Sequence, residues 1–272
     1  MFNHQKVHLN DPPRILPTPD QLRELTVSNP ALVEFADRIA GMLRMYPHFV
    51  IVKGMEDDDE CALTMRICER IRGLGPLAEP AASFSRVEIR PEKPNKASKP
   101  DKKHRGKRYS STSNPMPLHT DSTFGARPHE LVAMQFVRVD PDGGNSLMAP
   151  VENVLAALDN GVKQILSEPI FPFGPDVFPI LWQQDGAPHI RYYRSQIDFA
   201  CDGGGHLSER SLEALDVLDA VLRRVDLMFQ FHAEAGETVY MHNTKVLHGR
   251  DGFSEHSDRL MYRVRIHAQN LG

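Results

Sequence analysis

The chain has 272 residues, which is enough for one sizeable hydrophobic core and fits a single domain over residues 1–272 better than two. Its 36 acidic and 32 basic residues nearly balance, so bulk charge gives no reason to expect a nucleic acid as partner. The chain has only three cysteines, and its first residues lack the apolar run of a signal peptide. It also has no stretch of roughly 18 to 20 apolar residues, so we expect a cytoplasmic protein without a membrane span.

The first third of the chain is predicted to be scaffold, mainly helical. Thr18-Pro19 and Asn29-Pro30 each read as a capping residue followed by proline at the first helical position. Apolar residues at helical spacing continue the second of these helices to Leu43. A short apolar strand is expected at residues 49–52, and the acidic run 57–60 precedes a third helix that ends near Gly73.

Residues 90–108 differ in composition from the rest of the chain. They contain nine basic and two acidic residues and no large apolar side chain, so this segment buries too little surface to offset its ordering entropy. One interpretation is a solvated surface loop. The other is a mobile cationic lid, which would attract an anionic substrate or a phosphopantetheine-bearing carrier protein.

A segment with two potential metal ligands follows at residues 117–124. His119 and Asp121 are two positions apart, and alternate residues of an extended strand point the same way. An imidazole and a carboxylate side by side would supply two of the three ligands of a 2-His-1-carboxylate facial site, which leaves positions on Fe(II) open. Many chains contain such a pair by chance, so the prediction depends on a third ligand elsewhere.

Residues 131–241 are predicted to alternate between strands, turns and helices. A β-rich run at 131–139, a turn at 140–144 and a segment starting at Ser146 lead to a short helix at 150–158. Asp185-Gly186 predicts a hairpin, followed by Arg191 and Arg194, for which we favour a solvent-facing position over contact with a substrate carboxylate. Two further strands, at 227–231 and 237–241, come after a helix capped by Ser208, whose apolar face is formed by Leu212, Leu215, Leu218, Val221 and Leu222.

The last motif lies near the end of the chain. His248 is followed after 11 residues by Arg259 and after 15 residues by Arg263. Together with His119-x-Asp121 and the segment Gly143-Gly144-Asn145-Ser146, this spacing resembles the Fe(II)/2-oxoglutarate oxygenases of the taurine dioxygenase and clavaminate synthase type. The resemblance is clearest over residues 117–158 and 234–268.

The resemblance implies a fold, cofactors and residue roles. The implied fold is a double-stranded β-helix, or jelly roll, with flanking helices; periodicity alone indicates only a mixed α/β chain with a β-rich centre. Fe(II) would be bound by His119, Asp121 and His248, which are then also the catalytic residues, with 2-oxoglutarate and O2 as cosubstrates. Ser146 and Arg259 would bind the outer carboxylate of 2-oxoglutarate, which a planar guanidinium fits well. Arg263 would bind an acidic group of the substrate.

The implied reaction is oxidation of an unactivated C–H bond in a small carboxylate or amino-acid-like molecule. Hydroxylation, desaturation and cyclisation all fit, each with release of succinate and CO2. The halogenases of this family have a small residue in place of the carboxylate, so Asp121 argues against halogenation.

Several alternatives remain open. The chain could be a non-catalytic metal-binding jelly-roll protein, a zinc or manganese enzyme with the same ligands, or an oxygenase acting on a substrate tethered to a carrier protein. His242 competes with His248, since residues six apart on an unbroken strand face the same way, but the spacing to Arg259 and the preceding Asn243 favour His248. Arg265 is interpreted as an ordinary surface residue, and the sequence does not indicate an oligomeric state.

Overall fold

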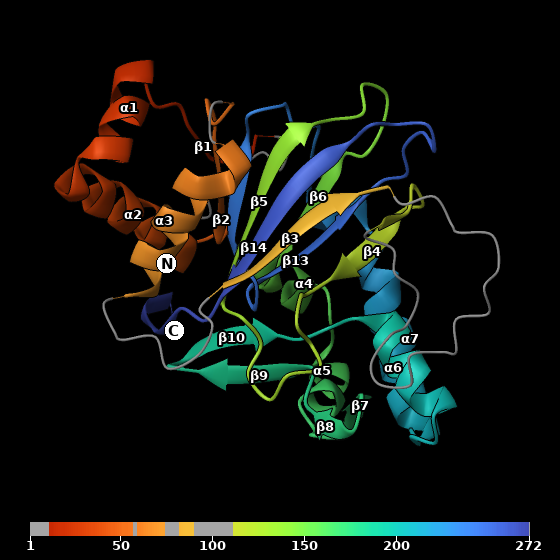
Figure 1. Ribbon diagram of the computed structural model, residues 1–272. Coiled ribbons are helices and arrows are strands. Elements are labelled where there is room, and N and C mark those ends of the chain that lie inside the picture. The colour runs from red at the N-terminus through yellow and green to blue at the C-terminus, as the bar shows by residue number, and fades with distance from the viewer. Residues whose placement is uncertain (1–10, 57–58, 74–81, 90–110, 272) are drawn as a thin grey trace.

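Two β-sheets lie at the centre of the structure, with helices on their outer sides (Figure 1). The computed structural model describes residues 11–56, 59–73, 82–89 and 111–271, so the basic segment 90–108 lies outside the described residues. One sheet has the order β1 (Arg14–Ile15), β2 (Phe49–Val52), β12 (Thr238–His242), β5 (Leu131–Arg138), β14 (Leu260–Ile266) and β3 (Ala82–Glu88). The other has the order β11 (Phe229–Phe231), β6 (Ser146–Pro150), β13 (Val246–Arg250) and β4 (Met116–His119). The mixed α/β class predicted from the sequence is confirmed.

The three helices predicted in the first third of the chain are present, and they cover the six-stranded sheet. In α1 (Pro19–Val27), Thr18 and Gln21 form a capping box, in which each side chain bonds the backbone N–H of the other. In α2 (Asn29–Arg44) the cap is Ser28, one residue earlier than expected. A short 3-10 turn, η1 (Asp59–Cys61), contains the described part of the acidic run and precedes α3 (Ala62–Arg72), which ends at Gly73.

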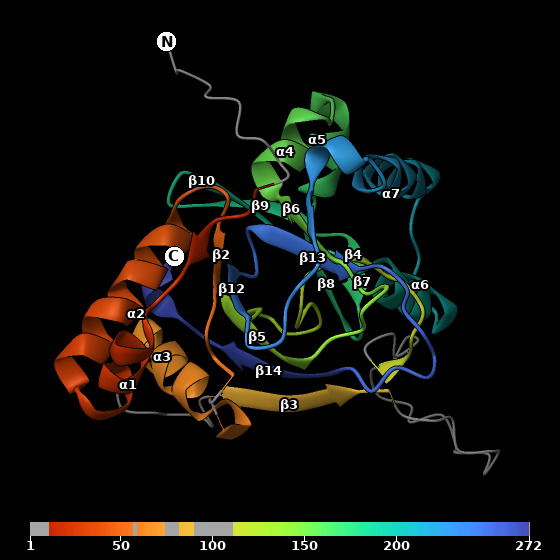
Figure 2. The ribbon, with the colours of Figure 1, turned by 90° about the horizontal axis from the view of Figure 1, so that it is seen from above.

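Strand β2 contributes side chains to two hydrophobic clusters, one on each face of its sheet. All four of its residues are buried, and successive side chains point to opposite faces. Val50 and Val52 pack among the N-terminal helices. Phe49 and Ile51 instead face the four-stranded sheet, where the Phe49 ring meets that of Phe229 on β11 edge-on, with centroids 5.2 Å apart. The apolar residues between the sheets therefore hold them together. Figure 2 shows β5 and β14 of one sheet opposite β6 and β13 of the other.

Helices from the second half of the chain pack on the far side of the four-stranded sheet. They contribute to a third apolar cluster that includes Leu118, Ala149 and Leu247 of the sheet. These helices are α4 (Val151–Ala156), α5 (Asn160–Leu166), α6 (Arg194–Asp202) and α7 (Glu209–Leu222). Ser208 caps α7 as predicted, but Leu212 is 42% exposed and does not belong to the buried face.

The remaining elements are short. Asp185 and Gly186, with φ of 50° and 77°, form the predicted hairpin turn between β9 (Leu181–Gln184) and β10 (Ala187–Ile190). A second hairpin joins β7 (Phe171–Phe173) to β8 (Asp176–Phe178), and 3-10 turns occur at η3 (Val225–Leu227) and η4 (Gln269–Leu271). Among the described helices, none has the length and apolar character needed to cross a membrane.

Candidate metal centre

Three side chains that are distant in the sequence meet between the two sheets. Strands β4 and β13 pair antiparallel with His119 opposite His248, and the two imidazole centroids are 4.4 Å apart. Asp121 completes the group: one potential ligand atom from each of the three residues lies within 4.8 Å of the other two, and all three residues are buried. No other group of this kind occurs in the described part of the chain.

The route by which Asp121 reaches this point differs from the prediction. Strand β4 ends at His119, and Asp121 lies in the turn that follows, so strand alternation does not place its carboxylate beside the imidazole. The backbone of Asp121 is instead fixed by Asn243, which follows β12: the Asn243 side chain accepts from the Asp121 N–H at 2.8 Å and donates to its carbonyl at 3.0 Å. A tertiary contact with Asn243 therefore positions Asp121, a role that strand geometry was expected to have.

Glycine allows the two histidine strands to approach. Gly249 lies next to His248 on β13, and a Cβ added there would lie 2.7 Å from the carbonyl oxygen of Met116 on β4. Contacts that short are not tolerated by side-chain carbons. Any larger residue would push β4 away from β13, and with it His119 from His248.

Each of the three residues has a buried side-chain atom without a hydrogen-bond partner in the described structure. The Nδ1–H of His119 donates to the carbonyl of Pro117 at 2.9 Å, which leaves its Nε2 with a free lone pair. That Nε2, Oδ2 of Asp121 and Nδ1 of His248 are buried without hydrogen bonds. Buried polar atoms without partners are costly, so this donor set fits a metal ion.

The local electrostatics keep the group ready to bind a cation. Burial lowers the pKa of His119, and burial together with the charge of His119 lowers the pKa of His248 to about 3. Burial alone would raise the pKa of Asp121, but the neighbouring charges, chiefly that of Arg263, bring it well below its usual value. At neutral pH the site therefore presents two neutral imidazoles and one carboxylate, the donor set of a facial iron site.

A pocket lined by the two histidines also contains the residues predicted to bind the cosubstrate. His119, His248, Ser146 and Arg259 all line it. The Arg259 guanidinium is buried between the rings of Phe136 and Phe253 and forms no ion pair with any described carboxylate. Burial lowers its pKa to about 10, so it stays charged at neutral pH. An anion is the natural partner for such a group.

The two arginines of β14 that follow Arg259 are also turned inward. Arg263 lines the same pocket, and its Nη1 lies 3.1 Å from Oδ1 of Asp121, while its Nε has no partner among the described residues. Arg265 is partly buried and donates to Ser85 of β3 at 3.2 Å. The interpretation of Arg265 as an ordinary surface residue is therefore wrong.

His242 was the competing candidate for the third ligand, and Arg191 was expected to face solvent. His242 is not near the metal group, because the chain turns between β12 and β13; its Nε2 bonds the carbonyl of Leu271 at 2.9 Å. Arg191 does not face solvent: it is 4% exposed and its guanidinium lies over the ring of Phe178. Arg194 is held by three carboxylates, those of Asp198, Asp216 and Asp219.

Two residues at this site were not predicted from the sequence. Arg250 is buried in the same pocket, where it donates to the carbonyls of Thr112 and Asp251. It is two residues beyond His248 on β13, so strand alternation could have placed it there. The Tyr193 ring lies 5.0 Å from that of His119 and comes from the start of α6, which no local pattern indicated.

A family model and several solved structures are similar to this chain. The family model described as taurine catabolism dioxygenase TauD, TfdA family matches residues 18–171 and 174–265. No curated protein matches. Among solved structures, asparagine oxygenase in complex with Fe(II), 2S,3S-3-hydroxyasparagine and succinate has a TM-score of 0.69 at 15% identity, covering 94% of this chain and 93% of that chain. The non-heme iron oxygenase OrfP in complex with Fe and alpha-ketoglutaric acid has a TM-score of 0.63 at 16% identity, covering 94% and 95%. At these identities the likeness shows a shared fold.

Proposed function

The chain belongs to the taurine catabolism dioxygenase TauD, TfdA family, and from that premise we propose an Fe(II)- and 2-oxoglutarate-dependent oxygenase that oxidises an unactivated C–H bond of a small substrate. The observation that carries this proposal is the convergence of His119, Asp121 and His248, with atoms that have no other partner. These three residues would hold Fe(II). When bound, the ferrous ion with 2-oxoglutarate and O2 supplies the oxidising power, releasing succinate and CO2.

The protein's own residues bind and orient the cosubstrate. Arg259 would pair with the outer carboxylate of 2-oxoglutarate through its planar guanidinium, and Ser146 would donate its hydroxyl hydrogen to the same carboxylate. Both side chains are buried in the pocket beside the metal group, where a hydrogen bond to a charged partner is strengthened by the low dielectric. Apolar neighbours such as Phe136 and Met261 keep water from that end of the pocket.

The substrate class rests on charge and on the structural neighbours. Arg263 lines the pocket with an unpartnered Nε, so we propose that it also contacts an acidic group of the substrate. The structure of asparagine oxygenase contains 2S,3S-3-hydroxyasparagine, and a structure of OrfP contains (3S)-hydroxy-L-Arg. We therefore propose an amino-acid-like carboxylate as substrate, and hydroxylation ahead of desaturation or cyclisation.

The architecture and partners complete the proposal. We propose a double-stranded β-helix, or jelly roll, within one oxygenase domain of residues 1–272, which the two facing sheets support. The basic segment 90–108 stays a proposed lid or docking segment for a carrier-protein-tethered substrate, although it lies outside the described residues. Nucleic acid and membrane are not proposed as partners.

Anaerobic spectroscopy tests the proposal directly. Fe(II) followed by 2-oxoglutarate should produce a weak visible charge-transfer band, and the band should be lost in His248→Ala. His256→Ala is the matched control, because His256 is exposed on the surface. A panel of amino acids is then screened for succinate release. Absence of the band in the wild type, with tight binding of zinc or manganese instead, would support the non-oxygenase alternatives.

A further inference from the structure

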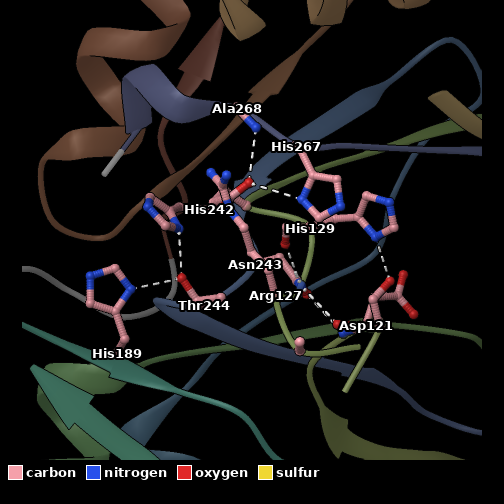
Figure 3. A network of polar contacts seen from close by, with 12 residues as sticks. Asp121, Arg127, His129, His189, His242, Asn243, Thr244, His267 and Ala268 are labelled. Carbon is pink, nitrogen blue, oxygen red and sulfur yellow. Dashed lines mark hydrogen bonds and ion pairs between the residues drawn. The ribbon is translucent and has the colours of Figure 1, made fainter. Parts of the chain in front are cut away.

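A second pocket lies apart from the metal group and has its own chemistry. It has a volume of about 390 Å³ and is formed by the segment around Arg127, by Phe178, Trp182 and His189, and by Arg191, which follows β10. It shares no lining residue with the pocket that contains Arg259. Figure 3 shows Asn243 and Thr244 between His189 and Asp121, so the second pocket lies on the other side of this network from the metal ligand.

Arg191 is the unusual group in this pocket. Its side chain is almost completely buried, and of its guanidinium nitrogens Nη2 donates to the carbonyl of Ala126 at 3.0 Å, whereas Nε and Nη1 have no hydrogen-bond partner. The guanidinium carbon lies 4.0 Å from the centroid of the Phe178 ring. Burial lowers the pKa of Arg191 to about 10, which leaves it charged at neutral pH.

No carboxylate neutralises this charge within the described structure. Glu130 also lines the pocket, but its two oxygens already accept from Arg127 and from the backbone N–H of Ala268. By contrast, Arg194, three residues further along, is paired with three aspartates. A buried cation without a counter-charge is destabilising, and an anion that enters from outside would relieve this cost.

The walls of the pocket suit a flat apolar group. The indole of Trp182 stacks on the imidazole of His189, with centroids 5.3 Å apart and planes 23° apart. Trp182 and Phe178 are both only partly covered. The bond between Nδ1 of His189 and Oγ1 of Thr244, at 2.8 Å, fixes the imidazole and hence the stacked surface.

We propose that this pocket binds a small organic carboxylate with a planar ring, the carboxylate pairing with Arg191 and the ring lying against Trp182 and Phe178. The site is separate from the oxygenase chemistry and does not depend on it. It therefore takes its ligand with or without Fe(II).

Trp182 provides the measurement, because it is the only tryptophan of the chain. Its fluorescence is followed in the metal-free full-length protein during titration with benzoate, with benzamide as the neutral analogue. We expect a saturable change with benzoate and at least about tenfold weaker binding of benzamide, as for loss of one charged hydrogen bond. Arg191→Met should weaken benzoate binding by a similar factor, whereas Arg224→Gln, which removes one exposed positive charge paired with Asp226, should not.

Arg191→Lys is a second variant for the case that Arg191→Met does not fold. It keeps the positive charge but loses the planar guanidinium. It should bind benzoate more weakly than the wild type while its thermal melting stays close to normal. The comparison of benzoate with benzamide needs no variant at all. Equal binding of the two, no saturable change in Trp182 fluorescence, or unchanged affinity in a folded Arg191 variant would overturn the proposal.

Discussion

The side chain of Asn243 bonds both backbone polar groups of Asp121. Its side-chain oxygen accepts from the Asp121 N–H at 2.8 Å, and its amide nitrogen donates to the Asp121 carbonyl at 3.0 Å. The same amide donates to the carbonyl of His129 at 2.8 Å, and the backbone N–H of Asn243 donates to the carbonyl of Glu130 at 2.7 Å. Both ends of segment 121–130 are thus tied to one residue of the neighbouring turn (Figure 3).

Removing the Asn243 side chain should lower the affinity for Fe(II) more than it lowers the stability of the fold. In Asn243→Ala the Asp121 backbone loses the contacts that orient its carboxylate, so we expect Fe(II) affinity to fall about tenfold to hundredfold, as for other residues that support metal ligands. Anaerobic Fe(II) titration measures this. Asn145→Ala, which also removes a side-chain hydrogen bond, to Asp251, is the control and should keep wild-type affinity. Unchanged Fe(II) binding with a lowered melting temperature would mean that Asn243 is only structural.

Arg259 should determine the affinity for 2-oxoglutarate without affecting the metal. Arg259→Lys keeps a positive charge but loses the planar fork, so we expect 2-oxoglutarate to bind about tenfold to hundredfold more weakly, with Fe(II) affinity unchanged. The visible band of the anaerobic complex reports both constants. Arg138→Lys, at an exposed ion pair with Asp258, is the matched control. A 2-oxoglutarate affinity equal to that of the wild type in Arg259→Lys would remove Arg259 from the cosubstrate site.

Local signals in the sequence predicted most of the elements. Thr18 and Ser208 start helices as expected, because capping depends on residues three positions apart. The hairpin at Asp185-Gly186 and strand β2 were likewise predicted from residues next to one another in the chain. The three-dimensional positions of the residues were harder to predict from the sequence. The spacing of the motifs indicated which residues belong to one site, but only through resemblance to a family.

The predictions that were wrong share a physical cause: tertiary contacts determine where these residues lie. Asp121 was expected on a strand and lies in a turn held by Asn243. Arg191 was expected in solvent, yet aromatic residues from β8 and β9 cover it. Leu212 has the right spacing for the buried face of α7, but no neighbouring element covers it. None of these contacts leaves a periodic pattern in the sequence.

Acid should destabilise the protein through its buried histidines. His242 is fully buried and its Nε2 bonds the carbonyl of Leu271; burial is the main reason that its pKa is lowered to about 3. In the unfolded chain its pKa is about 6.5, so between these values the unfolded state binds more protons. The contribution of His242 is therefore complete above about pH 6.5 and is lost as the pH falls toward about 3, at about 1.4 kcal/mol per pH unit.

Urea unfolding at several pH values between about 7 and 4.5 tests this sign. His242→Asn removes the titrating group, so its unfolding free energy should depend less steeply on pH than that of the wild type. His256→Asn, at an exposed position, should retain the wild-type slope. An identical slope in His242→Asn would show that His242 does not titrate in this window.

Gly249 should control the distance between the two histidine strands. A methyl group at this position would lie 2.7 Å from the Met116 carbonyl oxygen and 3.1 Å from the backbone nitrogen of Leu118, and backbone atoms cannot yield as a flexible side chain does. Gly249→Ala should therefore separate β4 from β13, cost about 1–3 kcal/mol in unfolding free energy, and weaken Fe(II) binding because His119 moves with β4. Gly41→Ala is the matched control, since nothing lies within 4 Å of its added carbon in α2, and it should be neutral or stabilising by about 0.5–1 kcal/mol. If Gly249→Ala bound Fe(II) as tightly as Gly41→Ala does, the approach of these strands would not be what sets the metal geometry.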